Sequence, residues 1–429
     1  MSVVFESSDE VLYPGARRSN GPRILRLKRK AAQLPVLRQV ARARRHLRTR
    51  KARAAEVTPP VCESVLAWAV GHPTTRYWRL APPERLEKQP PHTIEPQAHW
   101  SFIQFPEVPV AEKYLVELEG ARLEVPKSGR TGNYVCPRLV LPDGYVSSES
   151  TSGHVKRCLP NPADLAKPME GDYFSLMSPY GSYGNYYHWL HDVLVSLYGV
   201  SPYLPSGTRF IVAPDLRPFH LESLSMVGIA PEQLITFDPR SEEYPTRAWR
   251  LERFWYSPGP IGACASSGAL EWLGAAGLAS LDSAPRPPHR FLYISRRQVL
   301  YRRAVNEDEV IAYLADHGFE FHTLEDYTLR EQIALFAEAK VVMGPHGAGH
   351  TNMIFSPRGL VVVDILNGDV NQCFHNMCLT LGHEYWYMFG DDIPDPSKNV
   401  QRPSKYDDIF VPLDKLARVT SLALASAAR

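Results

Sequence analysis

The stretch from Phe291 to Leu366 constrains the fold more than any other part of the chain. It contains three short apolar runs, FLYIS, KVVMG and LVVVDI, and helix-like segments separate them. Buried strands that alternate with helices are typical of a doubly wound parallel sheet. The spacing therefore predicts an α/β sheet here, with a helix that begins at Asn306 and a capping box completed by Glu309.

A glycine-containing turn follows the second of these apolar runs. Val341 to Gly344 suits a buried strand, and Gly347 and Gly349 let backbone amides face outward before a helix-like segment near Thr351. A helix N-terminus carries free N–H groups and a partial positive charge, so it attracts anions. The turn is predicted to cradle phosphate. The alternative is an ordinary exposed loop whose glycines serve only the turn.

A second group of donors ends the preceding strand. Ser295 and Arg296 close the run YISRR, and Arg302 and Arg303 follow in a short loop. Guanidinium groups match phosphate oxygens in a bidentate manner. Because two donor clusters follow successive strands, the phosphate interpretation is favoured over the plain loop.

Three separated runs resemble glycosyltransferase family 61. They are, in order, YGNYYHWLHDVLVSL, ISRRQVLYRRAVNEDEVIAYL and LEDYTLREQIALFAEAKVVMGPHGAGHTNMIF, within residues 171–390. The resemblance implies a GT-B-like fold, in which two Rossmann-like domains face each other. It also implies transfer of a sugar from a nucleotide-sugar donor, with a UDP-sugar expected, to a glycan or lipid-linked glycan. Bacterial members are linked to capsular and other surface polysaccharides, which implies the same pathway here.

The first of these runs carries the candidate base. If Tyr186 to Leu197 is helical, His188 and Asp192 share a face, and His191 lies one turn from His188. An inverting sugar transfer needs a base that takes the acceptor proton. Asp192 is the first candidate and His188 the second. Asn185 and His191 are placed on the acceptor side, although Asn185 is equally suited to cap the helix and His191 to be hydrogen-bonded core.

The donor residues are implied by the family's second signature. Glu325 occupies its acidic position and is expected to accept hydrogen bonds from ribose, the alternative being a carboxylate at a helix N-terminus. His350 stands where leucine is common and Asp364 where glutamate is frequent, so the donor sugar is not predicted. The residues implied to line the diphosphate pocket are Ser295, Arg296, His346, Gly347, Ala348 and Asn352, with Arg302 or Arg303 added.

No acidic pair of the DxD type lies beside a strand end in the phosphate region. Arginines and helix dipoles are therefore expected to neutralise the leaving diphosphate, and neither a metal nor a cofactor is predicted. One rival function is a non-catalytic nucleotide-sugar sensor, which would keep the anion site but need no base. A phosphotransferase lacks support because the chain has no P-loop motif.

Composition divides the chain into four parts. A basic arm over residues 1–60 precedes an N-terminal α/β domain over 61–270, which forms the acceptor side and has a β-rich section with a turn at Asp143-Gly144. A Gly/Ser/Ala/Pro-rich connection from Pro258 to Pro288 leads to a Rossmann-like nucleotide-sugar domain over 285–410. Residues 411–429 are predicted to form a C-terminal helix.

The basic arm contains fifteen of the chain's 48 Lys and Arg residues between Arg17 and Arg53, and no Asp or Glu. Val36 and Val40 belong to an apolar series at helical spacing, so a helix lying on anionic lipid and a solvated arm are equally favoured. Nucleic acid ranks last because no aromatic residue lies between Arg17 and Arg53. The six cysteines form no CxxC motif, no apolar run reaches eighteen residues, and the N-terminus lacks a signal-peptide pattern. A cytoplasmic protein, peripheral at the inner face of the membrane, is expected.

Overall fold

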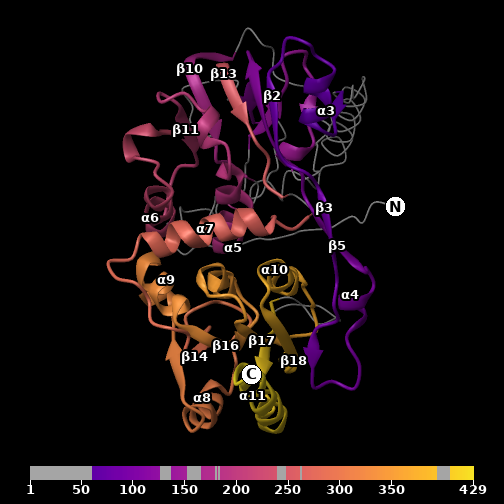
Figure 1. Ribbon diagram of the computed structural model, residues 1–429, viewed down its shortest axis with the longest axis vertical. Coiled ribbons are helices and arrows are strands. Elements are labelled where there is room, and N and C mark those ends of the chain that lie inside the picture. Colours follow the sequence, from indigo (N-terminus) through magenta and orange to yellow (C-terminus); the bar gives the residue numbers. More distant parts are fainter. Residues whose placement is uncertain are drawn as a thin grey trace, which may run out of the picture.

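Two β-sheets dominate the described part of the chain, one above the other in Figure 1. The computed structural model describes residues 60–125, 137–151, 166–178, 181, 184–238, 248–260, 263–393 and 406–429. The predicted basic arm, apart from residue 60, lies outside these ranges, as do Cys136 and Cys158. Membrane contact through the arm and a cytoplasmic location therefore stay predictions. Among the described helices, none is long and apolar enough to cross a membrane.

The upper sheet is mixed. Its strands run in the order β1-β9-β8-β7-β13-β10-β11-β12, with β6 paired to both β13 and β2. The neighbours β13, β10, β11 and β12 are parallel, whereas β7, β8 and β9 pair in antiparallel fashion. The predicted β-rich section and the predicted βα units thus share one sheet, and the expected turn at Asp143-Gly144 joins β8 to β9. The strand bounds are β1 Val61–Cys62, β2 Tyr77–Ala81, β6 Lys113–Glu119, β7 Arg122–Glu124, β8 Arg138–Val140, β9 Val146–Ser147, β10 Lys167–Ser175, β11 Arg209–Val212, β12 Leu234–Thr236 and β13 Ala248–Tyr256.

The lower sheet is parallel throughout, in the order β15-β14-β16-β17-β18-β4. Successive residues of β16 face opposite cores: Val342 packs in the core shared with α9 and α10, and Met343 in the core shared with α8 and α11. The predicted doubly wound parallel sheet is therefore observed. The strand bounds are β4 His92–Thr93, β14 Arg290–Ile294, β15 Phe319–His322, β16 Ala339–Pro345, β17 Val361–Leu366 and β18 Glu384–Phe389. Two small two-stranded sheets lie outside this one: β3 (Glu84–Glu87) pairs with β5 (Glu107–Val110), and β19 (Asp391–Ile393) pairs with β20 (Asp408–Phe410).

Helices cover both sheets, and the predicted C-terminal helix is present as α11. Their bounds are α3 Val65–Val70, α4 Trp100–Ile103, α5 Tyr186–His188, α6 Pro218–Met226, α7 Ser267–Ala279, α8 Glu307–Ala315, α9 Leu329–Ala337, α10 Cys373–Leu381 and α11 Leu413–Ala427. A π-helix η4 (Trp189–Val193) and 3-10 segments complete the set: η1 Glu149–Thr151, η5 Leu194–Leu197, η6 Ser201–Tyr203, η7 Pro231–Gln233, η8 Leu324–Asp326 and η9 Ala348–Phe355.

One segment of the N-terminal half belongs to the lower sheet. Strand β4 extends that sheet beside β18, and the backbone N–H of His99 donates to the Tyr387 hydroxyl at 2.8 Å. Glu95 accepts the Phe389 N–H at 3.1 Å. The division of the chain at 61–270 does not anticipate this crossing, because a two-residue strand carries no periodic signal.

The predicted connection from Pro258 to Pro288 contains the helix α7, which lies across the middle of Figure 1. The side chain of Ser266 caps it, accepting the Ala269 N–H at 3.2 Å. A Cβ on Gly274 would come within 2.5 Å of the Ile354 carbonyl oxygen, and one on Gly277 within 2.6 Å of the Phe355 ring. The stretch lies between β13 of the upper sheet and β14 of the lower sheet, as a connection would, but it also contains a packed helix whose glycines allow close contact with η9.

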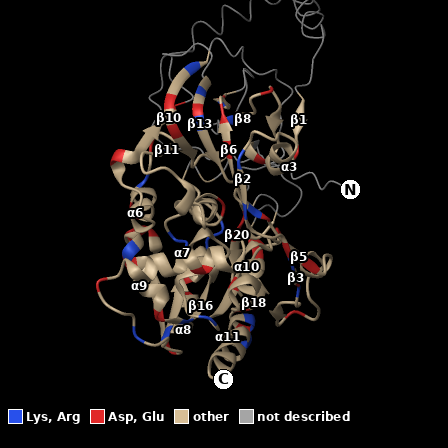
Figure 2. Ribbon diagram, turned by 45° about the horizontal axis from the view of Figure 1, so that its top comes forward, with Lys and Arg blue, Asp and Glu red and all other residues tan. Residues whose placement is uncertain are grey.

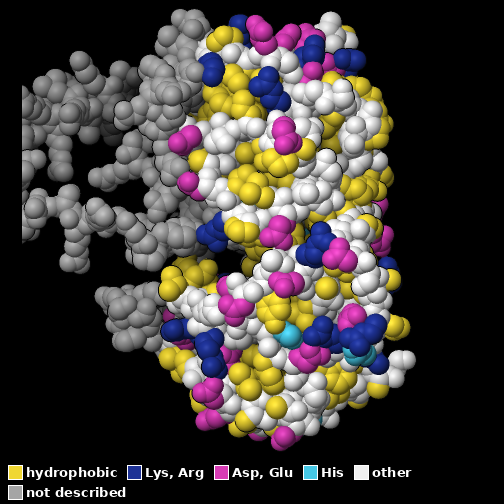
Figure 3. All heavy atoms as spheres, turned by 90° about the vertical axis from the view of Figure 1, so that its left-hand side faces the viewer, with side chains coloured by type: hydrophobic (Ala, Val, Ile, Leu, Met, Phe, Trp, Pro, Cys, Tyr) yellow, Lys and Arg dark blue, Asp and Glu magenta, His cyan; other side chains and the backbone are white. Residues whose placement is uncertain are grey.

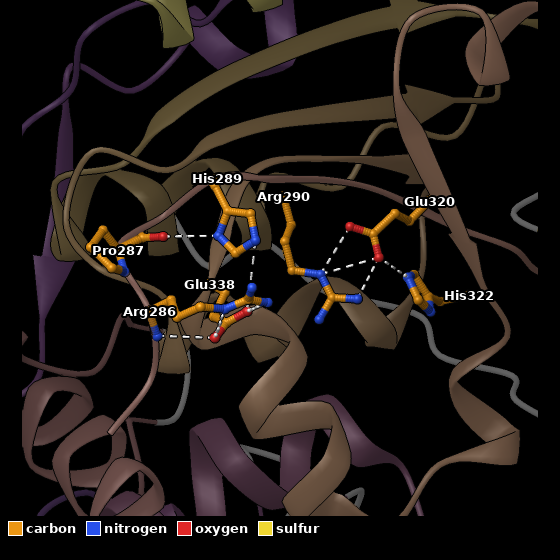
Figure 4. A network of polar contacts seen from close by, with 7 residues as sticks. All are labelled: Arg286, Pro287, His289, Arg290, Glu320, His322 and Glu338. Atoms are coloured by element: carbon orange, nitrogen blue, oxygen red, sulfur yellow. Dashed lines mark hydrogen bonds and ion pairs between the residues drawn. The ribbon is translucent and has the colours of Figure 1, made fainter. Parts of the chain in front are cut away.

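The chain enters the lower sheet through two arginine-carboxylate pairs (Figure 4). Arg286 donates to Glu338 through its backbone N–H at 2.9 Å and its guanidinium at 3.0 Å. Arg290, at the start of β14, donates to Glu320 of β15 at 2.9 Å, and His322 lies 3.5 Å from the same carboxylate. These contacts fix the first strand of the sheet against its neighbour.

The capping box predicted for α8 does not form. Asn306 is the N-cap residue, but its side chain donates to the Val411 carbonyl and accepts the Val411 N–H, both at 2.9 Å. Tertiary contact with the start of α11 has replaced the local cap. A capping box does form in α9, between Thr328 and Glu331.

Charge is distributed over both halves of the molecule. Figure 2 shows basic and acidic residues in the upper and lower halves, and on the face in Figure 3 the two signs are interspersed. The electrostatics of any site therefore depend on which individual charges are paired.

The substitution Gly274→Ala tests the packing of α7. We expect it to destabilise the protein by about 1–3 kcal/mol, because the added methyl group meets a backbone carbonyl that cannot move aside cheaply. On helix propensity alone the same change would stabilise by about 1 kcal/mol. Chemical denaturation gives the sign, with Ala275→Gly on the exposed face of α7 as the propensity control. A stabilised Gly274→Ala variant would contradict the packing role.

Candidate active site between the two sheets

The upstream signature forms a helical segment whose winding changes twice. The α-helical turn α5 passes into the π-helix η4 and then into the 3-10 turn η5. The predicted helix from Tyr186 to Leu197 is confirmed in extent but not in uniform winding. Asn185 is exposed and caps the segment, its Oδ1 accepting the His188 N–H at 3.3 Å. Single π-turns inside helices are frequent at functional sites.

Asp192 lies between two imidazole rings. Its Oδ2 is 2.6 Å from His188 Nδ1, and its Oδ1 is 2.8 Å from His191 Nδ1. Burial alone would raise the pKa of Asp192, but the hydrogen bonds to both histidines outweigh it and lower the pKa to about 2. The predicted shared face of His188 and Asp192 is thus observed, and the carboxylate is ionised at neutral pH.

His191 lies behind Asp192. It is 2% exposed, its ring stacks on Tyr187 at 4.9 Å, and its Nε2 is 3.7 Å from Cys264 Sγ. Burial opposes protonation, whereas the hydrogen bonds to Asp192 and Cys264 raise the pKa of His191. The ring therefore supports the carboxylate from within the protein. Its predicted place on the acceptor side stays a prediction that this buried position does not favour.

The glycine turn follows β16, and the helix η9 begins directly after Gly347, earlier than the predicted start near Thr351. The amides of Ala348 and Gly349 come too early in η9 to have a partner inside the helix, whereas the His350 N–H donates to the Gly347 carbonyl at 3.0 Å. Anion binding by these amides stays a prediction. A Cβ on Gly347 would lie 1.9 Å from Arg296 Nη1. Glycine at this position therefore lets the Arg296 guanidinium rest against the turn.

A buried carboxylate orients His346. The Nδ1 of His346 is 2.7 Å from Asp364 Oδ2, which also accepts the Tyr385 hydroxyl at 2.9 Å. Burial would raise the pKa of Asp364, but His346 and then His350 and Tyr385 lower it. His350 is 1% exposed and lies 4.0 Å from the same carboxylate, and burial lowers the pKa of His350 to about 4. His350 thus packs inside the fold.

The arginines of the basic loop fall into two pairs. Arg297 binds Glu307 and Asp308, and Arg303 binds Asp408, with nitrogen-oxygen distances between 2.6 and 3.1 Å. Arg296 and Arg302 form no ion pair with any described residue.

The two unpaired guanidiniums flank one ring. The Cζ atoms of Arg296 and Arg302 lie 5.6 and 5.3 Å from the centre of the Tyr301 ring. Burial and the charge of Arg302 lower the pKa of Arg296 to about 10, so it remains protonated at neutral pH. Two adjacent cations without a carboxylate counter-ion form a candidate anion site. Tyr301 has no motif of its own, and sequence reasoning missed it.

Two predicted pocket residues already have protein partners. Ser295 donates its hydroxyl to Glu307 at 3.1 Å, which organises the loop. The buried Asn352 donates to Gln332 Oε1 at 2.9 Å and accepts the Tyr186 hydroxyl at 2.5 Å. Asn352 therefore connects the upstream signature to η9 and α9, and contact with a diphosphate stays a prediction.

Glu325 is exposed and lies in the turn η8, before α9. The first turn of α9 has its own acidic residue, Glu331, which forms the capping box with Thr328. Glu325 itself lies in the first turn of the 3-10 helix η8, so the alternative of a helix N-terminal carboxylate stays open for η8 and does not apply to α9. Its charge acts on the nearby Arg296, which is compatible with the predicted ribose contact.

Ring contacts join the two signatures in space. Tyr187, which stacks on His191, packs edge-on against Phe374 at 5.8 Å, and Phe374 lies 4.8 Å from His346. The predicted base and the predicted phosphate turn thus belong to one composite site. Phe374 was not predicted, because nothing in its local sequence separates it from ordinary core. Within the described residues, no three His, Cys, Asp or Glu side chains are grouped to hold a metal ion, and metal independence stays a prediction.

Comparison with known proteins agrees with this arrangement. Residues 186–363 match the family Glycosyltransferase 61. The chain carries a glycosyltransferase 61 domain. The match includes every predicted site residue except Asn185, which immediately precedes it.

Three curated relatives are glycosyltransferases by name. The chain is 28% identical over 154 residues to the EGF domain-specific O-linked N-acetylglucosamine transferase of Drosophila melanogaster. It is 25% identical over 235 residues to beta-1,2-xylosyltransferase XYXT1, and 32% over 98 residues to alpha-1,3-arabinosyltransferase XAT3, both of Oryza sativa subsp. japonica. These alignments cover 34%, 48% and 22% of this chain and 29%, 47% and 16% of the relatives. The chain thus spans less than half of each relative's length.

The substitution Asp364→Asn tests the buried pair in the glycosyltransferase 61 domain. At pH 7 we expect a loss of about 1–3 kcal/mol in unfolding free energy, because His346 and Tyr385 lose a buried, ionised hydrogen-bond acceptor. The folded pKa of Asp364 lies below the unfolded value of about 3.9, so this stability is fully present above about pH 3.9 and is lost as pH falls from there through the lower, folded value. The difference between wild type and variant should therefore be unchanged between about pH 7 and pH 5 and should shrink at about pH 3, as measured by denaturation at these three values.

The exposed pair formed by Asp308 is the control for this experiment. Asp308→Asn should cost less than about 1 kcal/mol at pH 7. Equal losses of unfolding free energy in the two variants would show that the burial of Asp364 adds nothing to the stability of the protein.

Proposed function

We propose that the protein transfers a sugar from a UDP-sugar to a hydroxyl acceptor with inversion, using Arg296 and Arg302 for the diphosphate and His188 as the base. The observation that carries the proposal is that only two of the four arginines in the basic loop form ion pairs with carboxylates. Arg297 and Arg303 are neutralised by carboxylates, whereas Arg296 and Arg302 are not, and Arg296 lies against the N-terminus of η9.

The donor diphosphate binds where three sets of hydrogen-bond donors meet. Arg296 and Arg302 supply guanidinium donors, the turn at Gly347 and Ala348 supplies backbone amides, and His346 lies at the head of the same turn. Charge develops on the β-phosphate as the glycosidic bond breaks, and fixed donors stabilise it without reorganisation. Metal independence is proposed because these groups can carry that charge by themselves.

His188 is favoured over Asp192 as the base. An ionised carboxylate only accepts hydrogen bonds, so the Nδ1 atom that contacts Asp192 carries the proton. This tautomer makes Nε2 the nitrogen that takes the acceptor proton, as in a carboxylate-histidine pair. With its pKa near 2, Asp192 is a poor proton acceptor at neutral pH and serves to orient the ring.

The same arrangement supports inversion. A retaining transfer through a covalent intermediate needs a nucleophile at the sugar carbon. Both oxygens of Asp192 are engaged by histidines, so it is poorly placed to attack. A single displacement assisted by His188 requires no such nucleophile.

We infer a GT-B type of arrangement from the position of this site between the two sheets (Figure 1). The names of the relatives specify N-acetylglucosaminyl, xylosyl and arabinosyl transfer, so uncharged sugars of these classes are proposed as donors. An acceptor in capsular or other surface polysaccharide stays a prediction from the family resemblance.

Donor binding tests the arginine assignment. By calorimetry with UDP, Arg296→Ala and Arg302→Ala should each weaken binding by roughly 10- to 100-fold, the loss of one charge-assisted contact. Arg303→Ala, the matched control, removes a paired cation and should change the Kd by less than about twofold. Binding of UDP should also survive EDTA. Loss of binding only in Arg303→Ala would overturn the assignment.

Turnover tests the base. Release of UDP from UDP-N-acetylglucosamine, UDP-xylose and UDP-arabinose is measured with water or pooled glycans as acceptor. His188→Gln is expected to lower kcat by about 10²- to 10⁴-fold while UDP still binds, because proton transfer is lost. Asp192→Asn should also lower kcat, since the ring loses its orientation. His289→Gln, at an exposed histidine outside the site, is the control.

Two outcomes would contradict this assignment. Turnover that survives His188→Gln but not Asp192→Asn would identify Asp192 as the base. Wild-type protein that binds UDP yet releases it from no donor with any acceptor would point to a nucleotide-sugar sensor.

A further inference from the structure

A cavity beside Asp192 has no part in donor binding. It lies between the ends of β8, β10 and β13 in the upper sheet, the loop that ends at Gly259, and the π-helix η4. Its volume is about 70 Å³, room for roughly five water molecules. The backbone oxygen of Asp192 would lie 2.1 Å from a Cβ on Gly259, so the loop passes directly over the proposed catalytic segment.

The walls suit an uncharged amphipathic ligand. Leu139, Leu176 and Phe254 supply apolar surface, while Glu149 and Asp192 are the lining carboxylates. No Lys or Arg is among the described lining residues. An anionic group would therefore meet two carboxylates with no cation in the wall.

Lys113, a buried cation beside the cavity, is hydrogen-bonded to groups of the wall. Lys113 donates to the Ser196 carbonyl at 2.5 Å and to the Ser257 hydroxyl at 2.6 Å. The Ser257 hydroxyl in turn donates to the Tyr114 carbonyl at 2.6 Å. The ammonium group is thus held by wall groups and does not line the cavity.

Tyr256 is the group that points to a ligand. It lines the cavity and is 8% exposed, and its hydroxyl lies close to Glu149 and Ser147 but forms no hydrogen bond of regular geometry with any described residue. Burial, with the charge of Glu149, raises the pKa of Tyr256 well above its usual range, so the hydroxyl stays protonated. A buried hydroxyl without a well-formed hydrogen bond is destabilising, and a bound hydroxyl group would relieve it.

Glu149 offers the complementary acceptor. Its Oε2 accepts the Tyr114 hydroxyl at 2.7 Å and the Val65 N–H at 3.1 Å. These two bonds fix the carboxylate in the wall, where it can accept further hydrogen bonds. A phenol donor and a fixed carboxylate beside apolar side chains match the hydroxyls and the apolar face of a pyranose ring.

We infer that this cavity binds an uncharged sugar residue of the acceptor, held by Tyr256 and Glu149, and presents it to the His188–Asp192 pair. The inference rests on the proposed function, because it assigns the acceptor to the side of the proposed base. It names a substrate class, a neutral glycan, in place of an anionic glycan or a peptide hydroxyl.

Ligand-observed saturation-transfer NMR tests the inference without turnover. The probes are methyl β-D-xylopyranoside and methyl β-D-glucopyranoside, with methyl β-D-glucuronide as the anionic comparison and a serine tripeptide as the peptide comparison. We expect the neutral glycosides to bind saturably and Tyr256→Phe to weaken them roughly three- to tenfold, the loss of one hydrogen bond. Ser175→Leu, which adds bulk to the wall, should abolish binding.

Tyr173→Phe is the matched control, because this buried tyrosine lies in the same sheet and donates to the Glu170 carbonyl outside the cavity. It should leave glycoside binding unchanged. Stronger binding of the glucuronide or the tripeptide, equal glycoside binding by Tyr256→Phe, or no glycoside binding would each overturn the inference. UDP binding, measured separately, is unaffected by these failures, so they are distinguishable from failure of the donor site.

Discussion

The hydrogen bond from the Tyr186 hydroxyl to Asn352 fixes the relation between the two halves of the site. Asn352 accepts this bond at 2.5 Å and donates to Gln332 at 2.9 Å, so α5, η9 and α9 meet at one buried amide. Close contacts of Gly274 and Gly277 with η9 add backbone-level packing beside it. A base on one signature and a phosphate turn on the other can cooperate only if their separation is fixed to within a fraction of an ångström.

Carboxylate pairing decides which charges in the glycosyltransferase 61 domain are available to a ligand. Arg303 has its charge balanced by Asp408, and an exposed pair of this kind contributes at most about 1 kcal/mol to stability. Arg296 is more buried and has no carboxylate partner, and although it donates to the Tyr301 carbonyl at 3.1 Å, its Nε has no hydrogen-bond partner among the described residues, so its desolvation is only partly compensated. An anionic ligand would supply the missing compensation. The two arginines therefore destabilise the ligand-free protein and at the same time form a binding site for an anion.

Sequence reasoning succeeded where the signal was local. The apolar runs of the lower sheet predicted three of its six strands, β14, β16 and β17, and their parallel direction, and the spacing of His188 and Asp192 predicted their contact. It failed where a distant partner decided. Arg302 and Arg303 are adjacent and indistinguishable in sequence, and only Asp408, 105 residues beyond Arg303, separates their roles.

The other differences have the same cause. Asn306 and Glu309 have the sequence of a capping box, but the Asn306 side chain instead forms two hydrogen bonds with the backbone of Val411. These two bonds outweigh the single bond of a local cap. The glycines of α7 resemble a linker because composition does not reveal whether a missing Cβ serves flexibility or contact. At these positions the glycine or amide side chain could serve either a local turn or cap or a contact with a distant part of the chain. In each case the structure shows the distant contact.

Asp192 and Asp364 solve the same physical problem on the two sides of the site. Each is a carboxylate kept ionised by imidazole, since removal from water would otherwise raise its pKa. In each case the contacting imidazole nitrogen is Nδ1, which fixes the tautomer and the orientation of the ring. The second histidine differs: His191 contacts Asp192 directly at 2.8 Å, whereas His350 stays 4.0 Å from Asp364. Both oxygens of Asp192 are therefore hydrogen-bonded to rings, whereas Asp364 bonds His346 and Tyr385 through Oδ2 alone, so a single ring, the one beside the phosphate turn, is oriented by that carboxylate.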